Sequence, residues 1–233
     1  MMRTFKIFRF NPEKDKKPYF QTYQTECPPG YTVLDALYDI KGIQDGTLSY
    51  RRSCRSGVCG SCGMKINGVN LLACKTQVES LKKKVIHIEP LPGFPVMRDL
   101  IVDLTPFWEK LEQIKPYLIN HTPPPTVERY QSAEDQLKIE EATWCILCNC
   151  CTSSCPSLWA NKEYLGPAAL LKAYRFVFDS RDEGAEERYK VLNTKSGLWR
   201  CHTIFNCMDA CPQEINITEY ISKLKTRIVS ERY

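Results

Sequence analysis

The sequence predicts an α+β protein in which a strand-rich N-terminal domain with one helix is followed by an all-α C-terminal domain. Three observations support this prediction. Apolar residues alternate with period two over much of residues 1–103, they recur at helical spacing over residues 104–233, and most of the 13 cysteines fall into spaced sets within these halves. We therefore expect two domains, at residues 1–103 and 104–233.

The N-terminal domain is expected to be a sheet with one helix across it. Asn67-Gly68 joins two short strand candidates as a hairpin turn. Thr32 is placed to cap a helix that ends near Gly42, and a segment rich in proline, 90–95, then breaks the pattern. The helix shares one apolar face, formed by Val33, Leu34, Leu37 and Ile40. Strands are expected at Thr4–Phe10, Tyr19–Thr25, Gly63–Ile66, Val69–Ala73 and Val85–Glu89.

The C-terminal domain is expected to be helical throughout. Its first helix should carry an apolar stripe and should be followed by a stiff link at 121–125, where three prolines follow one another. The stripe is formed by Phe107, Leu111, Ile114 and Leu118. Further helices are expected at Ser132–Glu141, Pro167–Asp179, Ala185–Leu192 and Thr218–Val229.

Composition favours reduced, metal-holding thiols over disulfides. A chain of 233 residues with 43% hydrophobic residues has a core of its own, and no secretory signal is expected at its start. A strand pattern begins almost at the first methionine, which leaves no room for a transit peptide. No apolar run reaches the roughly 18 residues of a membrane helix. We expect a cytoplasmic bacterial product or an already processed chain that meets a membrane only through a partner.

The charge of the chain is uneven. Residues 1–103 carry 16 Lys and Arg against 10 Asp and Glu, whereas residues 104–233 carry 16 against 17. Arg51, Arg52 and Arg55 crowd the first cysteine loop, where they could offset a negatively charged cluster or dock an acidic partner. The run 82–84 of three lysines is expected to be a solvated face. A basic half also leaves open a zinc-binding module that touches nucleic acid, a distant alternative.

The first cysteine set has the spacing of plant-type ferredoxins, which hold a 2Fe-2S cluster. A four-residue gap, a two-residue gap and a fourth cysteine further on define this spacing, and the loop is rich in glycine. Glycines let the backbone wrap closely around a cluster. A zinc site would more often show two separated Cys-x2-Cys pairs. The predicted ligands are Cys54, Cys59, Cys62 and Cys74.

Two further cysteine sets form a flawed repeat. The first cysteine row is Cys145-x2-Cys148-x2-Cys151-x3-Cys155-Pro, and the second cysteine row is Cys201-x5-Cys207-x3-Cys211-Pro, with Ile204 where the first has Cys148. In two-cluster ferredoxins the fourth cysteine of each row ligates the other cluster. This crossing predicts a 4Fe-4S cluster on Cys145, Cys148, Cys151 and Cys211. It leaves a three-ligand site, suited to a 3Fe-4S cluster, on Cys155, Cys201 and Cys207.

Two of the 13 cysteines are left over from the three sets. Either Cys150 or Cys151 could be the third ligand of the first cysteine row, and the x2 spacing favours Cys151. Cys27 fits no set and is expected to be a small buried residue. The sequence contains no Gly-x-Gly-x-x-Gly after a strand, no Walker loop and no Ser-His-Asp constellation. We therefore expect a carrier of single electrons whose donor and acceptor lie on other chains.

The cysteine phrases resemble a known family. Arg51-Arg-Ser-Cys-Arg-Ser-Gly-Val-Cys-Gly60, Cys145-Ile-Leu-Cys148, Ser154-Cys-Pro-Ser157 and Arg200-Cys-His-Thr-Ile-Phe-Asn-Cys207 are similar to those of the iron-sulfur subunit of succinate dehydrogenase and fumarate reductase, respiratory complex II. The resemblance implies a plant-type 2Fe-2S ferredoxin domain of the β-grasp fold, followed by an all-α two-cluster domain of the bacterial ferredoxin type.

The resemblance also implies partners and a direction for the electrons. A flavoprotein subunit with FAD would oxidise succinate, and electrons would pass through the 2Fe-2S, 4Fe-4S and 3Fe-4S clusters to quinone on a membrane anchor, with heme b allowed on that anchor. The chain would then lie peripherally on the cytoplasmic face of the bacterial inner membrane, or on the matrix side in mitochondria. A fumarate reductase working in reverse is the alternative within the family. No nucleic-acid partner is expected.

Only some of the family's residues near the quinone are found at the matching positions of this chain. His202 matches the succinate dehydrogenase phrase, and its alternative role is that of a hydrogen-bonded structural histidine. Pro156 and Ile204 match pocket positions, and Lys225 matches a lysine on the last helix. Where relatives have a second tryptophan this chain has Ala160, so Trp159 could take its place or the pocket could differ.

Overall fold

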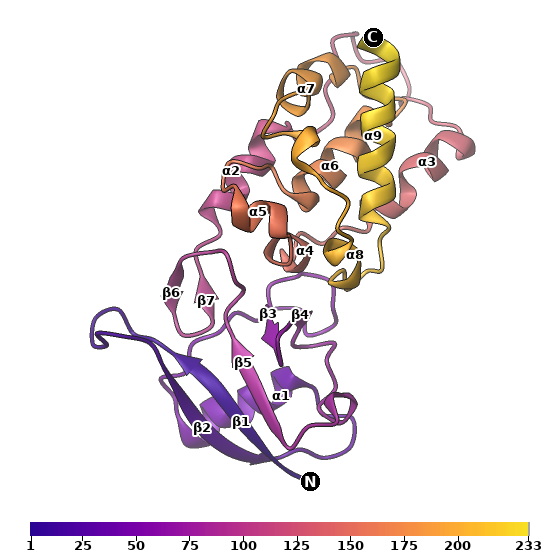
Figure 1. Ribbon diagram of the computed structural model, residues 1–233. Coiled ribbons are helices and arrows are strands. Elements are labelled where there is room, and N and C mark those ends of the chain that lie inside the picture. The colour runs from indigo at the N-terminus through magenta and orange to yellow at the C-terminus, as the bar shows by residue number, and fades with distance from the viewer. Residues whose placement is uncertain (233) are drawn as a thin grey trace. The chain divides into compact units, whose positions relative to one another are not determined.

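A computed structural model describes residues 1–232, and the chain divides into two compact units. Unit 1 contains residues 1–104 together with 146–154, and unit 2 contains 105–145 and 155–233. Mixed sheet in the first and helices in the second confirm the predicted α+β class (Figure 1). Cys148 and Cys151 of the first cysteine row therefore belong to unit 1, whereas Cys145, Cys155 and the second cysteine row belong to unit 2.

Unit 1 is built on a five-stranded sheet of order β2-β1-β5-β3-β4. The strands are β1 (Met2–Arg9), β2 (Tyr19–Glu26), β3 (Gly63–Ile66), β4 (Val69–Leu72) and β5 (Val85–Glu89). β1 and β5 run parallel, and the other neighbours are antiparallel. Alternation along β1 buries Phe5 and Ile7 completely, as a sheet with one covered face requires. The five expected strands are present, with ends that differ by two residues at most.

The helix of unit 1 begins where its capping residue predicts. α1 (Val33–Asp39) starts with a capping box in which Thr32 and Asp35 satisfy each other's backbone N–H groups. Its aliphatic residues Val33, Leu34, Ala36 and Leu37 are buried, and the helix lies across the sheet (Figure 1). The chain then continues through a wider turn, Ile40–Gln44, beyond the predicted end at Gly42. A short 3-10 turn, Glu79–Leu81, precedes β5.

A small second sheet in unit 1 was not predicted. β6 (Val96–Arg98) and β7 (Ile101–Val102) pair after the proline-rich segment. Asp99, between them, accepts hydrogen bonds from Arg9 Nε at 3.0 Å and from the Ser49 backbone N–H at 2.8 Å. Arg9 also pairs with Asp45, so one buried guanidinium connects β1 to two distant loops.

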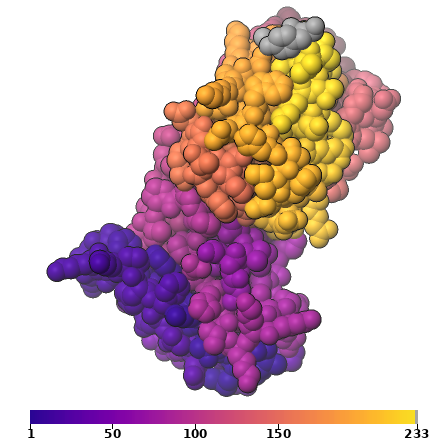
Figure 2. Space-filling view, viewed as in Figure 1, coloured from indigo at the N-terminus to yellow at the C-terminus, as the bar shows by residue number. Residues whose placement is uncertain are grey.

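Unit 2 packs its helices around α6 (Pro167–Val177), most of which is buried. Its neighbours are α2 (Thr105–Gln113), α3 (Ala133–Thr143), α7 (Ala185–Leu192) and α9 (Ile217–Arg232). α9 keeps one side at the surface, drawn in yellow in Figure 2. The shorter helices are α5 (Pro156–Ala160), α8 (Asn206–Asp209) and a 3-10 turn at Leu198–Arg200.

The first helix of unit 2 is shorter than its apolar stripe predicts. α2 ends at Gln113, and Lys115 adopts a φ of 49° directly before Pro116. A residue before proline is disfavoured in the helical region, which explains this end. Leu118, the last member of the predicted stripe, therefore lies outside the helix. The fully buried Arg188 fixes the chain here by donating to the carbonyl oxygens of Ile114, Lys115 and Tyr117.

Candidate iron-sulfur cluster sites

The loop after Leu48 stabilises the thiolate form of Cys54. Cys54 Sγ accepts hydrogen bonds from the backbone N–H groups of Ser56 and Val58 at 3.4 Å and of Cys59 at 3.3 Å. These bonds, led by the one from Ser56, lower the pKa of Cys54 to about 6. The loop turns back on itself through Arg55 and Gly57, which have positive φ angles of 60° and 75°. A loop that stabilises negative charge on sulfur suits a thiolate-ligated cluster.

Two of the remaining predicted ligands of this set, Cys62 and Cys74, lie next to each other. Cys62 and Cys74 are 3% and 8% exposed, and their thiols form a hydrogen bond. Burial, followed by the hydrogen bond and charge of Cys74 and the charge of Cys59, raises the pKa of Cys62 to about 12. Buried thiols that resist ionisation lose their protons when iron binds between them, because the positive charge of iron stabilises the thiolates. The donor set therefore fits a 2Fe-2S cluster.

Arginines lie beside this loop as the sequence predicts. The guanidinium carbons of Arg52 and Arg55 lie 4.8 and 5.4 Å from the centre of the Tyr38 ring, which is half-exposed. Stacking on one ring holds the two cations at the surface of the loop. Arg51 is half-buried. Cys27 is 2% exposed, as expected of a cysteine outside the sets.

The two cysteine rows have the same backbone conformation. Leu147 and Asn149 flank Cys148 with φ angles of 55° and 65°, and Thr203 and Phe205 flank Ile204 with 55° and 70°. Each row continues into a four-residue helix, α4 (Cys150–Ser153) or α8 (Asn206–Asp209). Left-handed conformations are rare in residues other than glycine and concentrate at functional sites. Ile204 therefore has the backbone position that corresponds to Cys148, but its side chain carries no sulfur atom.

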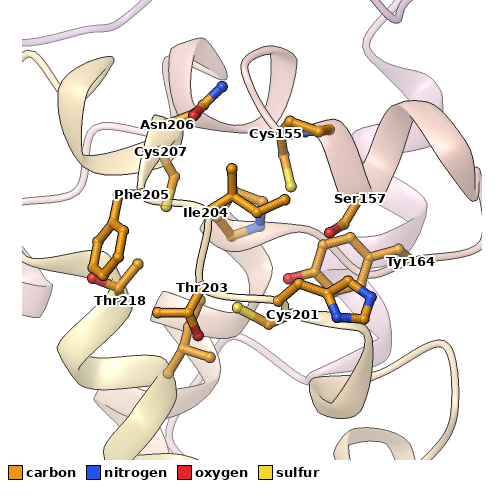
Figure 3. A pocket seen from close by; sticks show the side chains of 14 residues that line it. Cys155, Ser157, Tyr164, Cys201, Thr203, Ile204, Phe205, Asn206, Cys207 and Thr218 are labelled. Atoms are coloured by element: carbon orange, nitrogen blue, oxygen red, sulfur yellow. The ribbon is translucent and has the colours of Figure 1, made fainter.

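The three predicted ligands of the 3Fe-4S site line one cavity in unit 2. Figure 3 shows the sulfur atoms of Cys155, Cys201 and Cys207 around a common space, with the Ile204 side chain among them. The cavity is also lined by Pro156, Ser157, Tyr164, Pro167, His202, Thr203, Phe205, Asn206, Thr218 and Ile221. Pro156 is the first residue of α5, so the chain turns into a helix directly after Cys155.

The electrostatics of this cavity suit a cationic occupant. Burial, and then the charges of Cys155 and Cys201, raise the pKa of Cys207 to about 12. Burial likewise raises the pKa of Cys155, with Cys201 adding to the shift. Iron bound between these sulfur atoms would supply the positive charge that stabilises the thiolates of Cys155 and Cys207. The residues present therefore fit an iron-sulfur cluster with three thiolate ligands.

Tyr164 completes the wall of the cavity and was not predicted. Its side chain is 1% exposed, and its hydroxyl is hydrogen-bonded with Cys201. Burial raises the pKa of Tyr164, and the nearby charges of Cys201 and Cys155 raise it further, so the hydroxyl remains a proton donor. The available signal was the position of Tyr164 shortly before Gly166-Pro167, where α6 starts. No sequence rule predicts from that position that the hydroxyl contacts a cysteine sulfur atom.

The predicted 4Fe-4S ligands are divided between the two units. In unit 1, Cys148 and Cys150 form a thiol hydrogen bond, and Cys150 is fully buried. Cys151 follows in α4, at the place that Cys207 has in α8. Cys145 and Cys211 belong to unit 2 and are half-buried. Within residues 1–232, no three side chains of His, Cys, Asp or Glu converge as a single metal ion would require.

The predicted quinone residues fall into three groups. Pro156, His202 and Ile204 line the cavity, and His202 and Ile204 are exposed. Trp159 and Ala160 end α5 with exposed side chains and do not line the cavity. Lys225 does not line it either.

The structure gives Lys225 a definite contact. Its Nζ donates to the carbonyl oxygen of Cys201 at 2.8 Å, and so α9 holds the backbone of the first ligand of the second cysteine row. Among the described residues, no helix is long and apolar enough to cross a membrane.

Comparisons with known proteins find a matching family in each half of the chain. Residues 4–109 match the family described as "2Fe-2S iron-sulfur cluster binding domain", and residues 137–212 match "4Fe-4S dicluster domain". A chain of the solved Mycobacterium smegmatis Sdh1 complex in the apo form has a TM-score of 0.86 and 27% identity, with 100% of this chain and 97% of that chain covered.

Two curated relatives match over nearly the whole length. The succinate dehydrogenase iron-sulfur subunit of Coxiella burnetii is 45% identical over 231 residues, which cover 98% of this chain and 97% of the relative. The mitochondrial succinate dehydrogenase [ubiquinone] iron-sulfur subunit of Candida glabrata is also 45% identical, with 97% and 91% covered. The names of these relatives do not favour the fumarate reductase alternative. The chain belongs to the family of succinate dehydrogenase iron-sulfur subunits.

Proposed function

We propose that this chain carries electrons from a FAD-containing flavoprotein subunit, where succinate is oxidised, to quinone at a membrane anchor. The observation that carries the proposal is the cavity of Cys155, Cys201 and Cys207, with Ile204 in the fourth ligand position. Three cluster sites on one chain are suited to moving single electrons, which is the chemistry that iron-sulfur clusters supply when bound.

The ligand sets of the proposal follow the crossed pattern. Cys54, Cys59, Cys62 and Cys74 would hold the 2Fe-2S cluster, and Cys155, Cys201 and Cys207 the 3Fe-4S cluster. The 4Fe-4S cluster would take Cys145, Cys148 and Cys151 from the first cysteine row and Cys211 from the second. The equivalence of Cys151 with Cys207 supports Cys151 over Cys150 as its third ligand. We keep 1–103 and 104–233 as the sequence limits of the two domains.

The exposed residues beside the cavity support a quinone site there. His202 directly follows the ligand Cys201, and Ile204 and Phe205 are 47% and 52% exposed. Apolar side chains suit a quinone ring and its tail, and an imidazole is able to deliver a proton to a reduced quinone oxygen. Trp159, 50% exposed at the end of α5, is proposed to contact the anchor or the quinone.

This arrangement would place the chain peripherally at a membrane, on the cytoplasmic face in bacteria or the matrix side in mitochondria. The anchor would supply the membrane-spanning part, the rest of the quinone site and any heme b. Nothing in the proposal requires nucleic acid.

The test is to isolate the complex through a tag on this chain. We expect co-purification of a flavoprotein with FAD and of a membrane anchor, a brown colour, and faster succinate oxidation with quinone than fumarate reduction with quinol. A colourless, zinc-containing protein would contradict the proposal. Faster fumarate reduction with both quinone classes would instead support the reverse direction.

A further inference from the structure

Two glycines of the first cysteine loop meet the backbone of the first cysteine row within unit 1. Gly60 lies between the predicted ligands Cys59 and Cys62 and has a positive φ of 69°. A Cβ atom on Gly60 would lie 2.7 Å from the carbonyl oxygen of Ile146 and 2.9 Å from Cα and Cβ of Cys148. Cβ atoms essentially never come this close to other heavy atoms. The two loops touch at Gly60 with no room for a side chain.

Gly63 repeats this close approach for a different reason. A Cβ atom there would lie 2.9 Å from the carbonyl oxygen of Cys148 and 3.6 Å from Cys150 Sγ. Gly63 is the first residue of β3 and does not have a positive φ, so space alone excludes a side chain. Gly60 and Gly63 therefore face the same ligand loop. Backbone conformation and lack of space exclude a side chain at Gly60, and lack of space alone excludes one at Gly63.

The facing segment is held in place and has little freedom to retreat. Asn70 of β4 is 5% exposed, and its Nδ2 donates to Ser154 Oγ at 2.8 Å and to the Cys150 carbonyl oxygen at 3.4 Å. Any group added at Gly60 or Gly63 would have to separate the two loops or break these bonds. The contact is between backbone and backbone, which yields less easily than the end of a side chain.

Other glycines of unit 1 show that this crowding is local. Gly30 and Gly68 have positive φ angles of 81° and 91°, yet an added Cβ would meet nothing within 4 Å. Gly57, in the same loop as Gly60, would meet only the flexible Lys75 side chain. Close approach is thus confined to the side of the loop that faces Cys148.

We propose that Gly60 and Gly63 are positioning residues that set the separation between the 2Fe-2S loop and the Cys148–Cys151 ligand loop, and with it the rate of electron transfer between the clusters these loops hold. This inference rests on the proposed function, which assigns the two clusters. The transfer moves one electron and breaks no bond, and tunnelling slows exponentially as the gap between donor and acceptor widens. A glycine at each contact gives the shortest gap that two polypeptide loops permit.

The test compares Gly60→Ala and Gly63→Ala in the purified complex. Gly30→Ala is the matched control, because it adds the same methyl group at a positive φ but into open space. Iron and sulfide content and the integrated 2Fe-2S resonance check that both clusters are present. The separation is read from microwave power saturation of the reduced 2Fe-2S signal after dithionite, since a nearby reduced cluster speeds its spin relaxation.

We expect Gly60→Ala and Gly63→Ala to retain the 2Fe-2S signal, to saturate at lower microwave power, and to reduce quinone with succinate several-fold more slowly. Gly30→Ala should match the unmodified complex in both measurements. If Gly60→Ala does not assemble, Gly63→Ala carries the test, because it imposes no left-handed strain.

Unchanged saturation in both variants with full clusters would overturn the inference. A Gly30→Ala variant with the same shift would also overturn it, and so would loss of the 2Fe-2S signal in both variants, since the glycines would then serve cluster formation. Failure of the proposed function is a separate result: the unmodified complex would show neither 2Fe-2S nor 4Fe-4S resonances.

Discussion

The two cysteine rows differ in side chains and not in backbone. Every position of the second cysteine row lies 56 residues after its counterpart in the first, and the residues around Cys148 and Ile204 have matching positive φ angles. The residues that end α4 and α8, Ser154 and Ala210, agree within a few degrees in φ and ψ. The two loops thus share one geometry, and the second has one thiol fewer than the first. We propose that this single side chain, on an equivalent backbone, determines whether the second site holds three irons or four.

The largest expected effect comes from removing the third ligand of the first cysteine row. Cys151→Ala should abolish the 4Fe-4S cluster, because Cys151 has the place of Cys207, whereas Cys150→Ala should leave it intact. Iron analysis and the dithionite-reduced spectrum measure both variants, and each serves as the other's control. The reverse result would break the equivalence of the rows.

Restoring the missing thiol should make the rows alike. Ile204→Cys is expected to convert the three-iron site towards 4Fe-4S, to lower its midpoint potential and to slow quinone reduction strongly, because net charge and cluster type set the potential. The oxidised spectrum and a redox titration measure these changes. Ile204→Val is the control and should keep three irons. An unchanged cluster type in Ile204→Cys would contradict the ligand position.

The hydroxyl of Tyr164 should tune the second-row site. A hydrogen bond to Cys201 stabilises the more negative reduced state, so Tyr164→Phe should lower the midpoint potential of the three-iron cluster. We expect the reduced-to-oxidised ratio at fixed ambient potential to fall by up to about tenfold, which is 59 mV for one electron. Tyr174→Phe, which removes a hydroxyl bonded to the Lys138 carbonyl, should leave that potential unchanged.

A smaller effect on the clusters is expected from Lys225, because its side chain bonds to a backbone carbonyl oxygen and not to a sulfur atom. Lys225→Met removes the 2.8 Å hydrogen bond to the Cys201 carbonyl and should speed loss of the three-iron cluster under chelator, without changing the 4Fe-4S cluster. The decay of each resonance during incubation measures this. Lys223→Met, on the same helix but paired with Glu219, should decay at the unmodified rate. Equal loss of both clusters would argue against a local role.

The smallest effect on the clusters should come from a charge in unit 1, which contains Cys148 and Cys151 of the first cysteine row. Burial raises the pKa of Asp45, but hydrogen bonds from Thr47, Tyr23 and Arg9 outweigh it and lower the pKa well below its usual value. Asp45→Asn should destabilise unit 1 by about 1–3 kcal/mol at neutral pH, while the three-iron signal of unit 2 persists.

The pH dependence of this effect has a definite sign. A lowered carboxyl pKa contributes stability above the unfolded value near 3.8, and that stability is lost as pH falls below it. The difference in melting temperature between Asp45→Asn and the unmodified protein should therefore stay constant from about pH 5 to 8 and shrink below about pH 4. A difference that grew on acidification would contradict the ion pair.

Local patterns explain why much of this fold could be predicted. Alternation located the first strand, the Asn67-Gly68 turn located the hairpin of β3 and β4, and Thr32 marked a helix start through its side-chain cap. What escaped prediction depends on contacts between distant residues. β6 and β7 form where Asp99 meets Arg9, and segment 146–154 joins unit 1 through Asn70 and the two glycines.

The candidate site shows the same division. Spacing alone grouped Cys155, Cys201 and Cys207, which do line one cavity. The Tyr164 hydroxyl and the Lys225 contact could not be predicted, because they depend on how α6 and α9 pack. The left-handed residues Leu147 and Thr203 also carry no sequence signal, since neither is a glycine, an asparagine or an aspartate.

The most direct test of the account is electron paramagnetic resonance of the complex as isolated and oxidised in air. We predict a three-iron signal, stoichiometric with this chain, that disappears on reduction with succinate. Absence of that signal, with two four-iron clusters appearing after dithionite, would show that a ligand other than a cysteine completes the Ile204 site, and would contradict the central claim.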